Sequence, residues 1–155
     1  MPDINGPTHR YIGASPGCWQ AYGELLAGGY GGESTGPVHR LTVDIYAAQH
    51  PGVPGKQSSQ SVVAHLFVLC LVLERGVDPA FATRAITQFV EKHKERGLAW
   101  MEPPPSLGEL TVLDVMSAGS AQDHNSRVMR WAESVWHAWT PHHPKVRAWA
   151  EELGY

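Results

Sequence analysis

The chain has 155 residues, a length typical of one domain and sufficient to bury a hydrophobic core. Hydrophobic residues make up 43% and charged residues 17%, which argues against intrinsic disorder. The net charge is −3 and no basic run occurs, so neither nucleic acid nor a membrane is expected as a partner.

Cysteine content and hydropathy indicate a cytoplasmic location. Two cysteines, Cys18 and Cys70, are too few for a disulfide framework. The first 17 residues are polar and proline-rich, unlike a secretory signal. The longest apolar run, residues 62–73, is too short to span a bilayer.

The N-terminal part of the chain predicts an arm followed by a first helix. Residues 1–16 show little periodicity and several turn-forming residues, so we expect an arm laid over the domain. Ser15 and Pro16 suit the cap and the first position of a helix that extends from about Cys18 to Ala27. The glycine-rich stretch 28–32 ends this helix and predicts a flexible connection.

Two central helices are predicted next, joined by a short turn. Pro37 suits a first helical position, and Pro51-Gly52 stops the helix that it begins. The following helix is expected to run from Ser58 or Ser59, with serine as its cap, to Arg75, where Gly76 stops it. This helix is apolar nearly all round and should therefore be buried.

The remaining sequence predicts further helices and one extended crossing. Asp78-Pro79 begins a helix that ends near Lys94, and the prolines of 100–105 require an extended segment. Residues 110–115 are rich in β-branched side chains, but no second strand exists to pair with them, so we favour a short helix. A long helix capped by Ser120 to about residue 139 and a final helix at 144–153 complete the chain.

Together these elements predict an all-α fold, a single-domain bundle of six to seven helices with short connections and a Pro-rich crossing. The domain is expected to cover residues 1–155, including the N-terminal arm 1–16. The oligomeric state stays open, a homodimer included.

The helix that begins at Pro37 carries most of the groups that can do chemistry. At 100° per residue, His39, Val43, Tyr46 and His50 fall on one stripe of it. Imidazole and thiolate are ligands of divalent metals such as zinc, so the leading hypothesis is a metal site. Its candidate ligands are His39, His50, His65 and Cys18.

Helix geometry restricts which of these ligands can meet. His39 and His50 are about 16 Å apart along one straight helix, so they cannot share an ion. His65, on the next helix, is expected beside residues 43–46, so a metal site that uses His65 with His39, or His65 with His50, is feasible. The alternative is a set of structural histidines, in which His65 donates to Asp44, Tyr46 or a serine because a buried polar group needs a partner.

Three further sites compete with the metal hypothesis. Metal-free acid–base catalysis would use His39, Asp44 and Tyr46, although Asp44 lies about 140° round the helix from His39. Cys18 near a helix N-terminus is a candidate nucleophile. Four tryptophans in the last 25 residues could line a pocket for a small-molecule ligand, although aromatic residues at helical spacing usually form core.

Several motifs of this sequence resemble a bacterial family known only as a domain of unknown function. They are Pro16-Gly-Cys-Trp-Gln20, His39-Arg-Leu-Thr-Val-Asp-Ile-Tyr-Ala-Ala-Gln-His-Pro-Gly52, Gln60-Ser-Val-Val-Ala-His65, Leu110-Thr-Val-Leu-Asp-Val115 and Trp131-Ala-Glu-Ser-Val-Trp-His-Ala-Trp139. The resemblance implies no activity, cofactor or partner. Many relatives carry additional N-terminal cysteines as Cys-x-x-Cys, and here only Pro-Gly-Cys18 corresponds to such a motif, so the resemblance does not extend to a cysteine-rich zinc site.

We therefore expect a metal-binding helical protein, with metal-assisted hydrolysis of a small molecule as one activity open to it. The alternative is a metal-free helical binding or interaction module.

Overall fold

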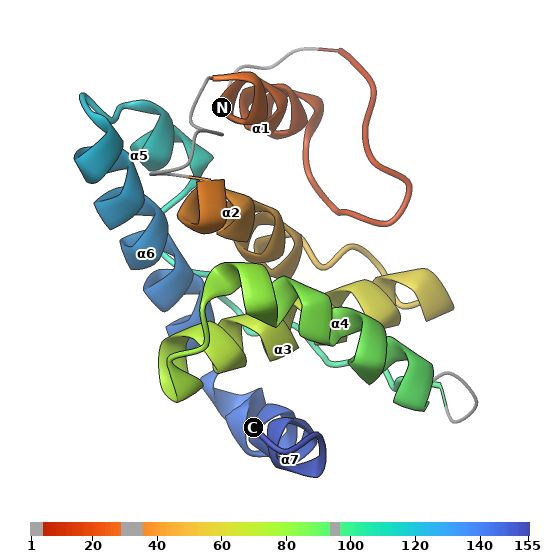
Figure 1. Cartoon of the computed structure of the whole chain (residues 1–155). Coiled ribbons are helices and arrows are strands. Elements are labelled where there is room, and N and C mark those ends of the chain that lie inside the picture. Colours follow the sequence, from red (N-terminus) through yellow and green to blue (C-terminus); the bar gives the residue numbers. More distant parts are fainter. Residues whose placement is uncertain (1–4, 29–35, 94–96) are drawn as a thin grey trace.

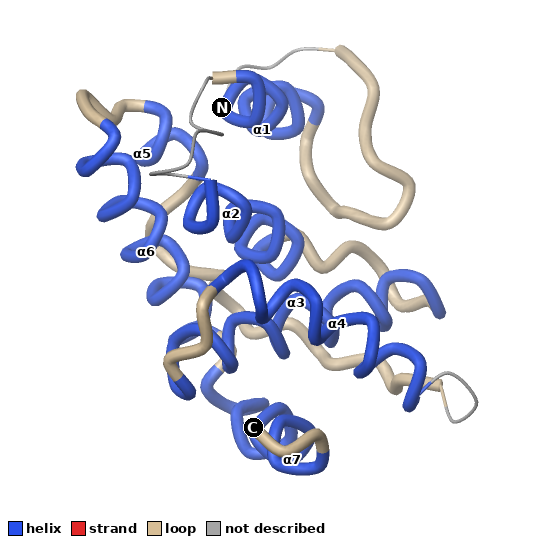
Figure 2. The backbone as a smooth tube through the Cα atoms, in the orientation of Figure 1, coloured by secondary structure: helices blue, strands red, loops and turns tan. Residues whose placement is uncertain are grey.

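The computed structural model describes residues 5–28, 36–93 and 97–155. Apart from Gly28, the glycine-rich connection predicted at 28–32 lies outside these residues. The described chain forms seven α-helices, one short 3₁₀ turn and no strand, which confirms the all-α prediction (Figures 1 and 2). The helices are α1 Pro16–Ala27, α2 Gly36–Gln49, α3 Lys56–Arg75, α4 Pro79–His93, α5 Val112–Met116, α6 Ala121–Ala138 and α7 His143–Glu152, with the turn η1 at Thr140–His142.

Helix ends follow local signals at most positions. The Ser15 and Ser120 hydroxyls accept hydrogen bonds from the Cys18 and Asp123 amides, which caps α1 and α6. The Thr111 hydroxyl caps α5 by accepting a hydrogen bond from the Leu113 amide, and the Asp114 carboxylate accepts one from the Thr111 amide. Gly76 ends α3 with φ of 65°, a left-handed conformation that glycine adopts without strain.

The start of α3 differs from the prediction. The helix begins at Lys56, directly after the Pro51–Gly55 turn, and neither Ser58 nor Ser59 caps it. Both serines are buried within the first turns, and the Ser59 amide already donates to the Gly55 carbonyl. Helix α3 therefore begins immediately at the end of the Pro51–Gly55 turn.

Helices α2 and α3 form the centre of the bundle. Helix α2 packs against α3 and α6, while α3 also packs against α4 and α7. Helix α6 runs along one side of the molecule from α5 to α7, and α1 lies over the end that holds α5 (Figure 1). By length and composition α3 alone, among the described helices, could cross a membrane, and 67% of its most apolar window is buried in the protein.

The two tryptophans of α6 and Trp139, the residue that follows α6, pack in the core. Trp131 and Trp139 are fully buried, and their indole N–H groups donate to Gln49 Oε1 at 2.9 Å and to the Ala48 carbonyl at 3.1 Å. Trp136 stacks on His143 of α7 with ring centroids 3.8 Å apart. These rings connect α6 and the residue that follows it to the C-terminal end of α2 and to α7.

Candidate functional site

The C-terminal end of α2 is held by hydrogen bonds to three other segments. Gln49 donates from Nε2 to the carbonyls of Leu107 and Leu110 at 3.2 and 2.7 Å, and accepts from Trp131. The arm contributes the Gly13 amide, which donates to the His50 carbonyl at 3.1 Å. The last residues of α2 are therefore positioned from the arm, from the loop before α5 and from α6.

Helix α1 brings a thiol to this end of α2. Cys18 lies in the first turn of α1, two residues after Pro16, and its Sγ is 3.3 Å from Nε2 of His50. The Tyr46 hydroxyl donates to the same sulfur at 3.4 Å. Tyr46 is itself fixed between the Tyr22 and His50 rings, with centroid distances of 3.9 and 4.2 Å.

The hydrogen bonds of His50 determine its tautomer. Nδ1 of His50 lies 2.9 Å from the Tyr46 carbonyl, which can only accept, so Nδ1 carries the hydrogen. In the neutral ring Nε2 then has a free lone pair, and it faces the Cys18 sulfur. The thiol can donate its proton to this nitrogen, which is the relation between a nucleophile and its general base.

Burial favours the neutral forms of these groups. It lowers the pKa of His50, an effect that the bond to the Tyr46 carbonyl opposes. Burial and the contact with Cys18 both raise the pKa of Tyr46, so this hydroxyl keeps its proton and remains a donor to sulfur. The resting imidazole of His50 is therefore neutral.

A small hollow gives access to the pair. It has a volume of about 390 Å³ and is lined by Gly13, Ser15, Cys18, Gln49, His50 and Thr111. None of these lining residues carries a charged carboxylate, ammonium or guanidinium group. The hollow therefore suits an uncharged small molecule.

The other predicted site residues lie elsewhere. Nδ1 of His39 is 3.2 Å from Nε2 of His124 on α6, and burial lowers the pKa of both imidazoles. Nδ1 of His65 lies 2.8 Å from Oδ1 of Asp44. Asp44 is one of the partners expected for His65 if its role is structural. Asp44 is 2% exposed and its carboxylate faces α3.

The structure thus brings together two of the four candidate metal ligands, Cys18 and His50. His39 and His65 have other partners, and no group of three or more His, Cys, Asp or Glu side chains among the described residues is arranged to hold a metal ion. Of the candidate acid–base residues, Tyr46 reaches the Cys18 sulfur, whereas Asp44 belongs to the His65 pair.

His124 and Gln49 were not singled out from the sequence. His124 has a recognisable signal, because it shares a helical stripe with Val128, Trp131 and Val135 and must therefore point into the core. Gln49 has none, since its two acceptors lie about 60 residues further along the chain.

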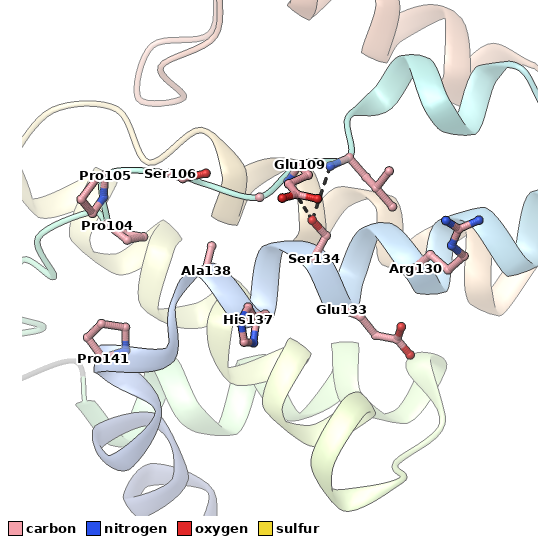
Figure 3. A pocket seen from close by; sticks show the side chains of 12 residues that line it. Pro104, Pro105, Ser106, Glu109, Arg130, Glu133, Ser134, His137, Ala138 and Pro141 are labelled. Carbon is pink, nitrogen blue, oxygen red and sulfur yellow. Dashed lines mark hydrogen bonds between the residues drawn. The ribbon is translucent and has the colours of Figure 1, made fainter.

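A hollow of about 780 Å³, larger than the one beside Cys18, lies between the proline-rich loop and the outer face of α6 (Figure 3). The loop approaches α6 closely at Gly108, where a Cβ atom would come within 2.9 Å of Ser134 Oγ. Ser134 accepts hydrogen bonds from the Glu109 and Leu110 amides at 2.9 and 3.4 Å. Arg130, Glu133 and His137 border this open basin, which contains no thiol and no tryptophan.

Fold and site together define an all-α protein with a thiol–imidazole pair at the junction of two helices. The chain belongs to a family of unknown function, DUF5946, whose family model matches residues 5–140. No curated protein and no solved structure gives a significant match to the chain.

Proposed function

We propose that this protein is a thiol-dependent enzyme that transfers or hydrolyses a small uncharged acyl group. The observation that carries the proposal is the 3.3 Å contact of Cys18 Sγ with Nε2 of His50, whose Nδ1 is held by the Tyr46 carbonyl. A nucleophile, a base and a group that orients the base are the three parts of a nucleophilic site. All three lie within residues 18–50.

Each residue has a defined role in the proposed reaction. Cys18 sulfur attacks the acyl carbon while His50 Nε2 takes the thiol proton and then gives it to the departing oxygen or nitrogen. The bond to the leaving group breaks, and a thioester to Cys18 remains. Water activated by His50 hydrolyses this thioester, which restores the thiol, and the Tyr46 hydroxyl stabilises negative charge on sulfur.

Alkylation by iodoacetamide tests the reactive thiol, and hydrolysis of 4-nitrophenyl acetate tests the acyl transfer. Mass spectrometry of the folded wild-type protein should locate the label on Cys18. His50→Gln should slow both reactions about 100-fold, the usual contribution of a general base. Cys18→Ser should abolish the label and the ester hydrolysis.

Cys70 provides a matched control within the same chain. It is fully buried, and burial together with nearby Glu74 raises the pKa of its thiol to about 11. Cys70→Ser should therefore leave both reactions unchanged. Equal labelling of the two cysteines, or a His50→Gln variant that is folded and as reactive as wild type, would overturn the proposal.

The second candidate is a zinc-binding protein that uses the same two side chains. It is favoured by the lone pair of His50 Nε2, because a metal-ligating histidine usually donates its other N–H to a carbonyl or carboxylate. Sulfur and nitrogen ligands of a tetrahedral zinc ion lie about 3.5 Å apart, close to the observed 3.3 Å. The remaining positions would take water and an external ligand.

Metal analysis separates the two candidates. Protein purified without an affinity tag should contain near-stoichiometric zinc if the second candidate is correct, and Cys18→Ser or His50→Ala should remove it. His39→Ala and His65→Ala should retain the metal, because those side chains have other partners. Ester hydrolysis that survives a chelator, in protein without metal, supports the thiol enzyme instead.

A further inference from the structure

A second pair of titratable groups lies on another face of α2, between α2 and α3. Asp44 Oδ1 is 2.8 Å from Nδ1 of His65. The Asp44 side chain is 3% exposed and the His65 side chain 20% exposed. The carboxylate is thus enclosed by protein, while the imidazole reaches the surface.

The Asp44 carboxylate determines the tautomer of His65. An ionised carboxylate only accepts hydrogen bonds, so Nδ1 of His65 carries the hydrogen and, in the neutral ring, Nε2 is an acceptor. Because Nδ1 points toward the buried Asp44, the exposed part of the ring is its Nε2 edge. Nε2 has no hydrogen-bond partner among the described residues.

His65 lines a pocket of about 280 Å³ between α3, α4 and the arm. Its lining includes the polar uncharged side chains of Gln57, Gln60 and Ser61 and the apolar side chains of Ala64, Ile86 and Val90. Tyr11 completes the lining and is the only other titratable side chain among these residues. The lining has no cation to attract an anion and no acidic group to attract a cation.

A hydrogen bond that only joins α2 to α3 would not need a buried carboxylate such as Asp44. Burying a carboxylate is unfavourable, and burial raises the pKa of Asp44 although the bond from His65 opposes this. A neutral side chain would join α2 and α3 without that desolvation. What a carboxylate adds is a fixed orientation of the ring, because it holds Nδ1–H on its side and leaves Nε2 as the proton acceptor.

From this juxtaposition we infer that His65 is a general base at a second site, which takes a small uncharged molecule with a weakly acidic hydroxyl group. The ligand O–H bond breaks and its proton moves to Nε2. The resulting imidazolium is stabilised by Asp44 on one side and by the ligand oxyanion on the other. Asp44 is the positioning residue, since it acts through His65.

The probe for this site is 4-nitrophenol, whose ionised form absorbs visible light whereas the neutral form does not. Wild-type protein at a pH below that at which free 4-nitrophenol ionises should bind the probe and show the absorbance of the phenolate. His65→Gln should lose this signal and weaken binding about tenfold, the effect of one hydrogen bond to a charged group.

Asp44 variants distinguish positioning from a merely structural contact. Asp44→Asn can present its amide oxygen to Nδ1 without a negative charge, so binding should persist while ionisation of the probe shifts to higher pH. Asp44→Glu should restore part of the ionisation at the lower pH. A loss of stability that is equal in both variants, with unchanged spectra of the bound probe, would assign the pair a structural role only.

Two controls keep this site separate from the Cys18 site. Cys18→Ser should leave the 4-nitrophenol spectrum unchanged, so a failure of the proposed thiol enzyme does not affect the outcome. His137→Gln removes a surface histidine that lines the basin of Figure 3 and should also have no effect. Identical spectra of the bound probe in wild type and in a folded His65→Gln variant would overturn the inference.

Discussion

Replacing Gln49 with leucine tests how the end of α2 is held. The side chain is 8% exposed and makes three hydrogen bonds, to the carbonyls of Leu107 and Leu110 and from the indole of Trp131. Leucine has a similar size but cannot replace any of them. The variant therefore loses the bonds and leaves the fully buried Trp131 N–H without an acceptor.

The expected loss follows from the number of bonds. Each hydrogen bond contributes a net 0.5–1.5 kcal/mol or about 1 kcal/mol on average, so Gln49→Leu should lower the free energy of unfolding by about 3 kcal/mol. In a chain of this size, that loss corresponds to about 6–12 °C in melting temperature. Gln49→Glu should lose at least as much at neutral pH, because its carboxylate faces two carbonyl oxygens.

Urea unfolding followed by circular dichroism measures the change, with the slope m expected to stay constant. Gln88 on α4 is exposed, and Gln88→Leu is the matched control, with a change of less than about 0.5 kcal/mol. If Gln49→Leu were as stable as this control, the three bonds would not hold the end of α2. A looser end should also slow alkylation of Cys18, because His50 is the next residue.

Three further predictions concern the backbone, a helix cap and pH. Gly52→Ala should destabilise the protein by more than about 2 kcal/mol, because Gly52 has φ of 73° and a Cβ would lie 2.6 Å from the Tyr11 carbonyl oxygen. Gly76 has φ of 65° but open space around it, so Gly76→Ala should lose only about 1 kcal/mol. Equal losses of stability for the two variants in thermal melts would contradict this. Thr111→Ala removes the cap of α5 and should cost about 1 kcal/mol in urea unfolding, with Thr111→Ser recovering most of it. Burial lowers the pKa of four histidines in the folded state, namely His39, His50, His124 and His143. The unfolded chain therefore binds more protons, and the free energy of unfolding should fall as the pH drops below about 6.5. Urea titrations at about pH 7.5 and 5.5 that show equal or greater stability at the lower pH would refute this.

Much of the fold could be predicted because helix ends depend on nearby residues. Prolines, glycines and capping hydroxyls mark the ends of α1, α4, α5 and α6 within the sequence itself. The short helix predicted within 110–115 is confirmed as α5, which runs from Val112 to Met116 after the Thr111 cap. The start of α3 was misplaced because a serine can cap a helix or lie inside it, and only the preceding turn distinguishes the two.

The candidate site was predictable in its residue types and not in its pairs. Tyr46, Cys18, His50, His65 and Asp44 were all recognised from the sequence, and the contact of His65 with Asp44 follows from the register of two adjacent helices. The contact of Cys18 with His50 depends on how α1 crosses α2, which no periodicity encodes.

Local sequence is sufficient to predict most of the helices, the turn that ends α2 and the presence of histidines on the faces of α2. These properties depend on backbone preferences and on hydrophobic spacing over a few residues. The contact of Cys18 with His50, and that of His39 with His124, a residue 85 positions away, depend instead on how the helices pack. Such pairs form because packing of the apolar faces sets the rotation of each helix, and the polar side chains near the contacts must then bond whatever partner that rotation brings.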